Sequence, residues 1–597
     1  MTDYTAPLRD ITFSMFEVFD YQHHYETRFQ GADVNPELIG VILEEFGRFC
    51  SEQLSPLNPV GDREGCTWNG GEVTTPAGFK EAYQQYVAGG WPALAGDPQY
   101  GGQGLPESLS IVLTEMRGTA NWAWGMYPGL SHGAVNTIKS HGSEEQKAVF
   151  LKKLVEGHWT GTMCLTEAHC GTDLGMLRTK ADPCADGSYS ITGTKIFISS
   201  GEHDLTENIV HIVLARLPDA PVGVKGISLF IIPKHLVNDD GALGDRNALH
   251  CGSLEHKMGI HGNATCVMNF DGATGFLLGE PNRGLEAMFT FMNTARIGTA
   301  LQGVAHMELG YQKALAYAKD RLQMRSVTGP KNPNGPADPI IVHPDVRRML
   351  LTQKALSEGG RMMITYTGKL VDVIEHATDE QDRRAAEDMM SFMTPVAKAF
   401  LTETGFESAN LALQCFGGHG YIKEWGVEQN VRDARIATIY EGTTGIQALD
   451  FTGRKVLGSG GELLRNFTKE IHLFCKENAH NDALKRFIIP LMALNQKWAD
   501  LTLHIGTKAL ENADEAGAAS VDYLMFSGYA CLAFFWAKAA LTAQQALEAG
   551  SEEPDFYAAK LHTASFYYDR ILPRTLVCEA GILSGAANLM SISTEQF

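Results

Sequence analysis

The chain lacks any run of basic residues. Among its 597 residues, 70 acidic side chains outnumber 49 lysines and arginines, which gives a formal net charge of -21 at pH 7. A surface that binds nucleic acid needs clustered positive charge to meet the phosphates. We therefore predict no nucleic-acid partner, whereas an acidic surface is compatible with an enzyme or an electron-transfer partner.

Cysteine patterns that would indicate a metal site or a disulfide framework are also missing. The 11 cysteines are scattered, and none forms a CxxC pair or a cysteine–histidine cluster with metal-ligand spacing. This usage is typical of thiols in a reducing compartment. His169 and Cys170 are adjacent, but no further ligand accompanies them at a suitable spacing, so we predict a structural role for both and no metal.

Long hydrophobic runs are scarce as well. Residues 1–13 include early acids and no apolar stretch, which argues against a secretory signal and favours a cytoplasmic location. The most membrane-like run covers residues 523–537 and stops at Lys538. A membrane-spanning helix needs about 20 apolar residues. This run therefore predicts a buried helix, and we expect no membrane span.

Motifs of several common enzyme folds are absent or lack their context. No GxGxxG follows a strand pattern and no GxxxxGK[ST] occurs, so neither a dinucleotide-binding fingerprint nor a P-loop is present. Residues 129–133 read GLSHG and match GxSxG, but a nucleophile elbow requires a buried strand before its serine. The preceding NWAWGMYP ends at Pro128 and makes a poor strand, so we interpret the match as coincidental.

What the sequence does contain is a succession of helical, then β, then helical patterns. Helical spacing prevails up to about residue 159, with a capping box at residues 143–146. Four β-branched or aromatic runs bounded by Gly, Asp or Pro then predict a compact antiparallel β domain. They are TKIFIS, ENIVHIVLARL, GISLFIIP and ATCVMNF. Helical patterns resume near residue 284, and a Pro/Gly-rich insert at residues 327–339 indicates an exposed loop.

The order of these patterns predicts a mainly helical α+β fold, because no strand–helix alternation supports a doubly wound sheet. GSGG at residues 458–461 marks a linker, and amphipathic helical patterns follow it. We expect this C-terminal extension to pack against the rest of the protein and to influence assembly. The predicted domains are an N-terminal helical domain at 1–159, a β domain at 160–280, a helical bundle at 281–457 and a helical extension at 458–597.

Two stretches carry candidate chemistry. Residues 414–447 open with a glycine cluster that would let the backbone approach a phosphate or a ring. They place Glu441 where an apolar run stops, and a carboxylate in such a position can act as a general base in a dry cleft. In residues 163–173, Thr166 and Thr172 flank a glycine, so hydroxyl and N–H donors could converge on an anionic ligand. Taken alone, residues 414–447 fit a solvated loop better than a site, and residues 163–173 could equally be a capped turn that leads into the β domain.

Together these stretches resemble the signature segments of the acyl-CoA dehydrogenase family. The resemblance rests on TExxxGTD from Thr166, KIFIS from Lys195, QxFGGxG from Gln414 and YEGTTGIQ from Tyr440, and it runs in register over about residues 91–457. Several ordered motifs over that length are specific to the family. The N-terminus, the C-terminal extension and TEAHCGTDLG are most similar to a bacterial subgroup of large members that includes 3-methylmercaptopropionyl-CoA dehydrogenases.

The resemblance implies a helical domain, a middle antiparallel β domain and a helical bundle that hold FAD between them. It implies a homodimeric or homotetrameric oxidoreductase that converts an acyl-CoA to its trans-2-enoyl-CoA and passes electrons to an electron-transfer flavoprotein. Glu441 matches the base that removes the α-proton while the β-hydrogen leaves as hydride to flavin N5. Some members carry this base before an arginine, but here Ala295 precedes Arg296 and cannot accept a proton.

The family match also implies roles for other residues. The backbone N–H of the base and a flavin hydroxyl would stabilise the charge that develops on the thioester oxygen. Arg321 matches an arginine that grips the FAD of a neighbouring subunit, and Phe197 stands where many members stack a tryptophan on the flavin. Arg296 and Gly442 match positions on the substrate side. The residues matched to FAD contacts are Leu165, Thr166, Thr172, Phe197, Ser199, Arg321, Gln414, Gly417, Gly418 and Thr443.

Some positions depart from the family pattern, and some questions stay open. Gly445 replaces a polar FAD contact, Gln429 replaces a basic residue, and Met324 with Arg325 replaces the Phe-Gly that usually follows the FAD arginine. The substrate is a fatty acyl-CoA or 3-methylmercaptopropionyl-CoA, since motifs do not report the depth of a pocket. An acyl-CoA oxidase and a non-catalytic scaffold that binds acyl-CoA or flavin are the alternatives.

Overall fold

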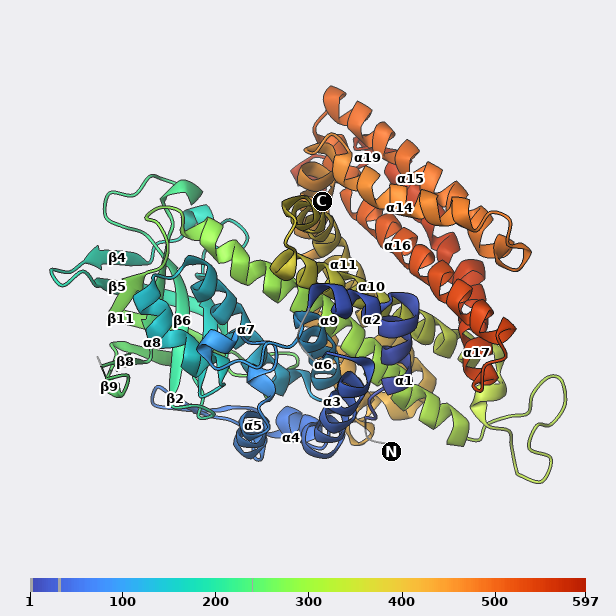
Figure 1. Ribbon diagram of the computed structural model, residues 1–597, viewed down its shortest axis with the longest axis horizontal. Helices are drawn as coiled ribbons and strands as arrows, with labels where there is room; N and C mark the ends of the chain where they lie inside the picture. Colours follow the sequence, from blue (N-terminus) through green and yellow to red (C-terminus); the bar gives the residue numbers. More distant parts are fainter. Residues whose placement is uncertain (1–3, 30–33, 239) are drawn as a thin grey trace. The chain divides into compact units, whose positions relative to one another are not determined.

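A computed structural model describes residues 4–29, 34–238 and 240–597 (Figure 1). Contacts within the chain divide it into two units. The sheet unit is Arg48–Gly298, and the helical unit combines Met1–Gly47 with Thr299–Phe597.

The sheet unit is built around a seven-stranded sheet. Its strand order is β3-β6-β7-β11-β5-β4, and β10 pairs with β11. Two small two-stranded sheets, β1–β2 and β8–β9, accompany it. The strands are β1 Thr67–Asn69, β2 Glu72–Thr74, β3 Trp159–Cys164, β4 Lys180–Pro183, β5 Tyr189–Ser199, β6 Asn208–Ala215, β7 Ser228–Pro233, β8 His235–Val237, β9 Leu243–Arg246, β10 Leu249–Leu254 and β11 Thr265–Leu277.

The four predicted β runs lie in β5, β6, β7 and β11, and the predicted fold class is confirmed. Neighbouring strands of the large sheet are antiparallel, except that β3 and β6 run parallel. Parallel strands need a long crossover connection. Here the chain between β3 and β6 first forms β4 and β5 at the opposite edge of the sheet, so β6 returns beside β3 in the same direction.

Both faces of the sheet are covered. Strands β6 and β7 are buried at every residue, because successive side chains point to opposite faces and each face has a core. One core contains Ile212 of β6 and Phe291 of α9, and the other contains Val213 of β6 and Phe230 of β7. Strands buried on both sides show nearly continuous apolar runs, which is the pattern by which they were predicted.

The helices of the sheet unit bear out two predictions. Ser143 is the N-cap of α8 and forms the predicted capping box with Gln146. Ser131 of GLSHG lies within α7, where its hydroxyl donates to the carbonyl of Tyr127 and accepts from the N–H of Gly161, so it is no nucleophile elbow. The helices are α4 Leu57–Glu64, α5 Phe79–Ala88, α6 Glu107–Ala120, α7 Trp122–His141 and α8 Glu144–Val155.

The helical unit is a set of long helices with a second layer supplied by the C-terminal extension. Helix α3 ends, and helix α9 begins, within the sheet unit. The helices are α1 Leu8–Thr12, α2 Tyr21–Arg28, α3 Pro36–Phe49, α9 Gly284–Asp320, α10 Pro344–His376, α11 Glu380–Phe416, α12 Val427–Arg435, α13 Thr444–Leu449, α14 Glu462–Glu477, α15 Lys485–Glu511, α16 Asp514–Glu548, α17 Pro554–Phe566, α18 Thr575–Ser584 and α19 Ala587–Met590.

Glycines bring α9 and α11 close together. A Cβ on Gly303 would lie 2.1 Å from the carbonyl oxygen of Leu401, and one on Gly405 would lie 2.8 Å from the Cα of Gly303. Any side chain at these positions would therefore force the helix backbones apart. The crossing brings α11, which is followed by the candidate site segments, against the middle of α9.

The C-terminal extension packs on the bundle, as predicted. Helix α16 lies along α10 and α11 (Figure 1) and also contacts α13. Trp536 of α16 donates through its indole N–H to the carbonyl of Ala355 in α10 at 3.0 Å. A Cβ on Gly528 would lie 2.2 Å from the ring of Phe400, so α16 and α11 meet without a gap. Helix α16 is long and apolar enough to cross a membrane, but 83% of its most apolar window is buried in the protein. The run at 523–537 is therefore a buried helix, as predicted.

Charged side chains join the two ends of the helical unit. Arg9 of α1 donates to Glu553, just before α17, at 3.0 Å. Lys560 of α17 is buried between Asp10 of α1 and Glu358 of α10, and its ammonium lies 2.8 Å from the Glu358 carboxylate. Because burying a charge is costly unless it is paired, these ion pairs tie the first helix to the extension.

Candidate active site

The loop after β3 is fixed by backbone pairing. Leu165 and Thr166 follow the buried end of β3, and the N–H of Ile196 in β5 donates to the Thr166 carbonyl at 2.9 Å. Glu167 and Cys170 then exchange two backbone hydrogen bonds of 2.9 and 3.0 Å, which closes a tight turn. The loop is thereby fastened to β5, the strand that carries Phe197 and Ser199.

Glu167 anchors this loop through a buried carboxylate. It accepts from the hydroxyl of Thr179 at 2.7 Å, from the N–H groups of Thr179 and Arg178 at 3.0 and 2.7 Å, and from the ammonium of Lys195 at 2.9 Å. Lys195 also donates to the Leu165 carbonyl at 2.9 Å. Although burial opposes ionisation, the Lys195 charge and these hydrogen bonds lower the pKa of Glu167 to about 2.

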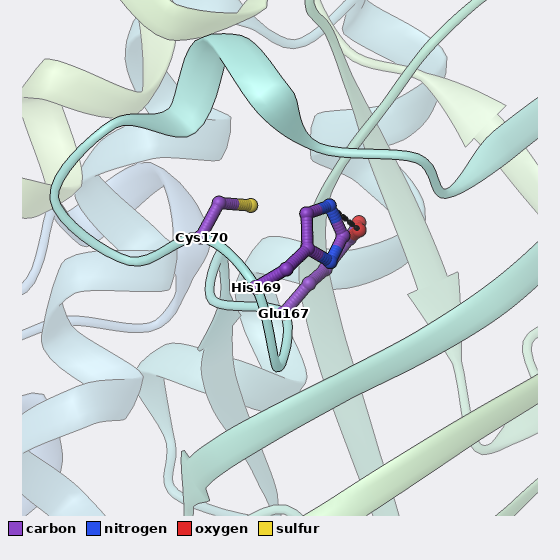
Figure 2. A group of neighbouring side chains, drawn as sticks. All are labelled: Glu167, His169 and Cys170. Atoms are coloured by element: carbon purple, nitrogen blue, oxygen red, sulfur yellow. Dashed lines mark ion pairs between the residues drawn. The ribbon is translucent and has the colours of Figure 1, made fainter.

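Glu167, His169 and Cys170 resemble a metal-binding group, because their ligand atoms lie within 4.8 Å of one another (Figure 2). Their contacts favour a structural turn instead. Nε2 of His169 lies 2.9 Å from the Met176 carbonyl and must therefore carry a proton that it donates. Glu167 is already saturated, and the Lys195 ammonium beside it would repel a cation. Burial raises the pKa of the Cys170 thiol, which disfavours the thiolate that a metal requires.

A β-bulge in β5 presents Phe197 to solvent. The register between β5 and β11 shifts between the pairs Lys195–Met268 and Ile198–Cys266, so Ile196 and Phe197 lie in the bulge. Phe197 has φ of 58°, and the residue is 59% exposed. A bulky residue rarely adopts positive φ, and such strain clusters at functional sites. The bulge therefore displays an aromatic ring that the core does not use.

The other predicted residues of the sheet unit are half-buried or exposed. Ser199 is half-buried at the end of β5, opposite Thr265 of β11, and Thr172 is exposed in the loop after β3. Arg296 is half-buried in α9, where it donates to the side chain of Asn293 at 3.4 Å. Ala295 before it offers no carboxylate.

In the helical unit, α11 ends at two glycines with open space around them, Gly417 and Gly418. Gln414 is exposed on the last turn of α11, and its carbonyl accepts from the N–H of Gly417. Gly417 has φ of 59°, and a Cβ on Gly417 or Gly418 would meet no atom within 4 Å. These two glycines therefore leave a free approach to the backbone, as the sequence predicted. His419 beyond them bonds to the hydroxyl of Tyr317 at 2.9 Å.

Arg321 lies just after α9, at the start of the insert. Its N–H donates to Tyr317 and its carbonyl accepts from Ile340, both at 2.8 Å. Within residues 4–29, 34–238 and 240–597, its guanidinium has no hydrogen-bond or ion-pair partner. Arg321 as a residue is half-buried, and a guanidinium without a protein partner suits a phosphate or carboxylate ligand.

The Pro/Gly-rich insert is exposed, as predicted, but it is organised around a buried carboxylate that the sequence analysis missed. Asp338 accepts from the backbone N–H groups of Ser326, Lys331 and Asn332 at 2.7–2.9 Å and from Arg325 at 3.2 Å. These hydrogen bonds lower the pKa of Asp338 to about 2, although burial opposes the shift. Arg325, one of the departures from the family pattern, thus has a local structural role.

Glu441 lies in a turn between α12 and α13. It has φ of 58° and is half-buried, and Gly442 after it has φ of 89°. Thr443 is the N-cap of α13, since its hydroxyl accepts from the N–H of Ile446 at 3.2 Å. This capping bond fixes the start of α13 at Thr444, three residues after Glu441.

Two donors that the sequence analysis did not assign hold this turn. Lys398 of α11 donates to the Gly442 carbonyl at 2.6 Å, and the Gln447 amide of α13 donates to the Glu441 carbonyl at 2.9 Å. Gln447 belongs to the YEGTTGIQ segment and could have been found there. Lys398 is the one lysine of α11 and belongs to no motif, so it left only a weak signal.

Each unit contains residues that fit part of a flavin dinucleotide. In the sheet unit, the exposed ring of Phe197 can cover a planar ring system. In the helical unit, Gly417 and Gly418 leave the backbone open to a phosphate, and Arg321 offers a guanidinium that no described residue binds. Five of the predicted FAD contacts lie in the sheet unit, and Arg321, Gln414, Gly417, Gly418 and Thr443 lie in the helical unit with Glu441.

Models of four protein domains match the chain. The N-terminal domain of acyl-CoA dehydrogenase matches residues 40–158, its middle domain matches 162–273, and its C-terminal domain matches 282–455. A further domain, described as acetyl-CoA dehydrogenase C-terminal like, matches residues 467–593.

Individual proteins are similar over nearly the whole chain. The 3-methylmercaptopropionyl-CoA dehydrogenase of Ruegeria pomeroyi is 44% identical over 95% of this chain and 96% of its own length. A broad-specificity linear acyl-CoA dehydrogenase of Mycobacterium tuberculosis is 34% identical over 96% of each. The crystal structure of an acyl-CoA dehydrogenase from Bacillus anthracis complexed with FAD, 19% identical, has the same fold with a TM-score of 0.73 over 94% of this chain and 90% of that one. On the matched domains and these identities, the chain belongs to the acyl-CoA dehydrogenase family.

Proposed function

We propose that the protein oxidises an acyl-CoA thioester to its trans-2-enoyl-CoA, with Glu441 removing the α-proton. Family membership supplies the coarser part, since the protein is an FAD-dependent oxidoreductase. The backbone conformation of the turn at Glu441 supports the finer part of the proposal, the role of Glu441 as the base. A long side chain in a left-handed backbone conformation costs about 1–3 kcal/mol and persists only where the surroundings enforce it. Here two buried donors enforce it at the position that matches the family base.

The chain's own residues divide the remaining work. Glu441 accepts the proton, and its N–H contributes to the stabilisation of the thioester oxygen as negative charge develops. Leu165, Thr166 and Ser199, with Thr172 and Phe197, would hold the cofactor from the sheet unit. When bound, FAD supplies the hydride acceptor.

The helical unit would contribute Arg321, Gln414, Gly417, Gly418 and Thr443 to cofactor binding. Arg296 and Gly442 would lie on the substrate side. Ala295 supports Glu441 as the base, because no carboxylate is available next to Arg296.

For the substrate, we favour 3-methylmercaptopropionyl-CoA over longer fatty acyl-CoAs. The relative named for that thioester is 44% identical, whereas the relative named for linear acyl-CoAs is 34% identical over a similar span. We further propose an electron-transfer flavoprotein as acceptor and a homodimer or homotetramer as the assembly. The four segments 1–159, 160–280, 281–457 and 458–597 would be its domains.

An anaerobic titration tests this proposal. Purified protein that retains its flavin is mixed with 3-methylmercaptopropionyl-CoA, butyryl-CoA or a long-chain acyl-CoA, and bleaching of the oxidised-flavin absorbance is followed. We expect rapid bleaching by the thioether substrate, loss of bleaching in Glu441→Gln, and no change in Glu387→Gln, a control on the exposed face of α11.

Each other result has a definite meaning. Unchanged bleaching in Glu441→Gln would refute its role as the base, and no bleaching by any acyl-CoA would refute the reaction. Preferential bleaching by a long-chain acyl-CoA would refute the substrate. Fast aerobic turnover with stoichiometric peroxide would identify an oxidase and exclude an electron-transfer flavoprotein as the obligatory acceptor.

A further inference from the structure

Two buried side chains from different helices donate hydrogen bonds to the backbone of the turn that contains Glu441. Lys398 is 0% exposed, and its Nζ lies 2.6 Å from the Gly442 carbonyl oxygen. Gln447 is 1% exposed, and its Nε2 lies 2.9 Å from the Glu441 carbonyl oxygen. Two consecutive carbonyls are therefore each held by a separate donor, one from α11 and one from α13.

The backbone between these donors has little freedom. Both Glu441 and Gly442 have positive φ, a backbone conformation that residues other than glycine rarely adopt. A Cβ on Gly442 would lie 2.4 Å from Nε2 of Gln447, so this residue is glycine both for its φ and for the close approach of the amide. The amide orientation of Gln447 is also fixed, since only its NH₂ can face a carbonyl oxygen.

We propose that Lys398 and Gln447 are positioning residues for Glu441 and hold its backbone in the conformation that aims the carboxylate at the substrate. This inference rests on the proposed function of Glu441 as the base. Without either donor, a peptide plane of the turn can rotate and Glu441 can relax toward an ordinary φ. The carboxylate then moves relative to the α-carbon, and a misplacement of about 1 Å can cost about 100-fold in rate.

Replacing each residue with methionine removes the donor and keeps most of the side-chain volume. The variants are Lys398→Met and Gln447→Met. The matched controls are Lys369→Met, which removes a lysine that donates to the Phe19 carbonyl at 2.8 Å, and Gln353→Met, which removes a buried amide that donates to the Met349 carbonyl. Both controls lie on α10, away from the turn in sequence and in their contacts.

For the two turn variants we expect the rate constant of flavin reduction to fall about 10- to 100-fold, with KM within about threefold of the wild type. We also expect a larger isotope effect with α-deuterated substrate, because proton removal becomes the slow step. Hydrogen exchange of the peptide covering residues 439–447 should accelerate in protein with or without substrate. The two controls should match the wild type in all four measurements.

A merely structural role predicts a different pattern. It would lower the fraction of active protein or its melting temperature while the isotope effect and the exchange of residues 439–447 stay at wild-type values, and this result overturns the inference. If Lys398→Met does not fold, Gln447→Met and Lys398→Arg decide in its place. Arginine keeps a donor, so Lys398→Arg should retain a wild-type isotope effect, and a rise would count against the inference.

The proposed function can fail separately. Glu441→Gln in the same assay reports on the base itself. Normal flavin reduction in that variant would refute the role of Glu441 as the base, but not the role of Lys398 and Gln447 in holding the turn. If no acyl-CoA reduces the wild type, hydrogen exchange still decides whether Lys398 and Gln447 hold residues 439–447. Unchanged exchange in both methionine variants would overturn the inference under either circumstance.

Discussion

The ion pair between Glu167 and Lys195 makes a quantitative test of how the loop after β3 is held. Both side chains are buried, with 6% and 0% of their surface exposed, and their charged atoms lie 2.9 Å apart. In Glu167→Gln the amide oxygen can face Lys195 and Thr179, but the NH₂ group then faces the N–H of Arg178, which loses its acceptor. The Lys195 ammonium also stays buried without a counter-charge.

The expected cost of Glu167→Gln follows from two independent arguments. Removing one partner of a buried ion pair costs about 3–5 kcal/mol. The pKa of Glu167, lowered from 4.5 to about 2, corresponds by linkage to about 3 kcal/mol of stability that the ionised carboxylate provides. The two values agree, so we expect a loss of about 3–4 kcal/mol.

Lys195→Met should destabilise the loop after β3 less than Glu167→Gln does. The carboxylate keeps its three other donors, from Arg178 and Thr179, at 2.7–3.0 Å and remains ionised. We expect a loss of about 1–3 kcal/mol. The double variant should be less destabilised than the sum of the single ones by about 1–3 kcal/mol, because the second change removes a group that has already lost its partner.

Hydrogen exchange measured by mass spectrometry on peptides covering residues 159–180 reports the local opening free energy and avoids treating a multidomain chain as two-state. The lowered pKa of Glu167 determines in which direction the stability of the loop changes with pH. The stabilisation by Glu167 is present above pH about 4.5 and is lost as pH falls toward 2. In Lys195→Met the folded-state pKa of Glu167 lies closer to 4.5, so this loss should be smaller and should be complete at a higher pH. Single variants that each cost below about 0.5 kcal/mol, or that add without coupling, would refute the reasoning.

Four further predictions follow from other parts of the chain. Gly303→Ala should lower the local opening free energy of α9, measured by hydrogen exchange, by about 2–3 kcal/mol, because its Cβ would overlap the carbonyl of the crossing helix. Gly298→Ala, whose Cβ would meet no atom within 4 Å, should not lower it. Asp338→Asn should open the insert to limited proteolysis at pH 7; in the wild type the same opening should begin as pH falls below about 3.8, toward the lowered pKa of about 2. Truncation after Gly458 should give insoluble protein in an expression assay, since it uncovers the faces of α10, α11 and α13 that α16 buries. Phe197→Ala should weaken FAD binding about tenfold in a fluorescence titration, through lost ring stacking.

These predictions have clear contrary outcomes. Equal stability of the Gly303 and Gly298 variants would mean that the helices can separate without cost. Protease resistance of the Asp338 variant would show that the backbone alone orders the insert. A soluble, folded truncated chain would refute the need for the extension, and unchanged FAD affinity in Phe197→Ala would mean that the exposed ring does not cover the flavin.

Sequence patterns predicted the elements whose burial has a simple period. The helix that begins at Glu462 could be predicted because it buries residues at helical spacing, and the strands β6 and β7 because their apolar runs are continuous. The capping box at Ser143 could be predicted because its two residues stand three positions apart. The parallel pairing of β3 with β6 could not be predicted in this way. It depends on where a distant strand returns in space, which no local pattern records.

The candidate site shows the same division. Glu441, Phe197 and the glycines after Gln414 were predicted because family motifs contain them. Lys398 and Asp338 were missed, because one charged residue within a helix or a loop becomes informative only when its partners are known. Their acceptors and donors come from segments whose proximity to them is a property of the fold.

The joining of the first helix to the extension has a consequence for synthesis on the ribosome. Arg9 and its partner Glu553 are separated by 544 residues. At about 5–20 residues per second, the first helix must wait about half a minute to two minutes for its partner to be made. Helices α10 and α11 are made before α16, so the faces that α16 later covers remain open to water or to a chaperone until α16 follows. We infer that the nascent chain needs protection from aggregation until translation is nearly complete, and that slow translation of the last segment prolongs this need.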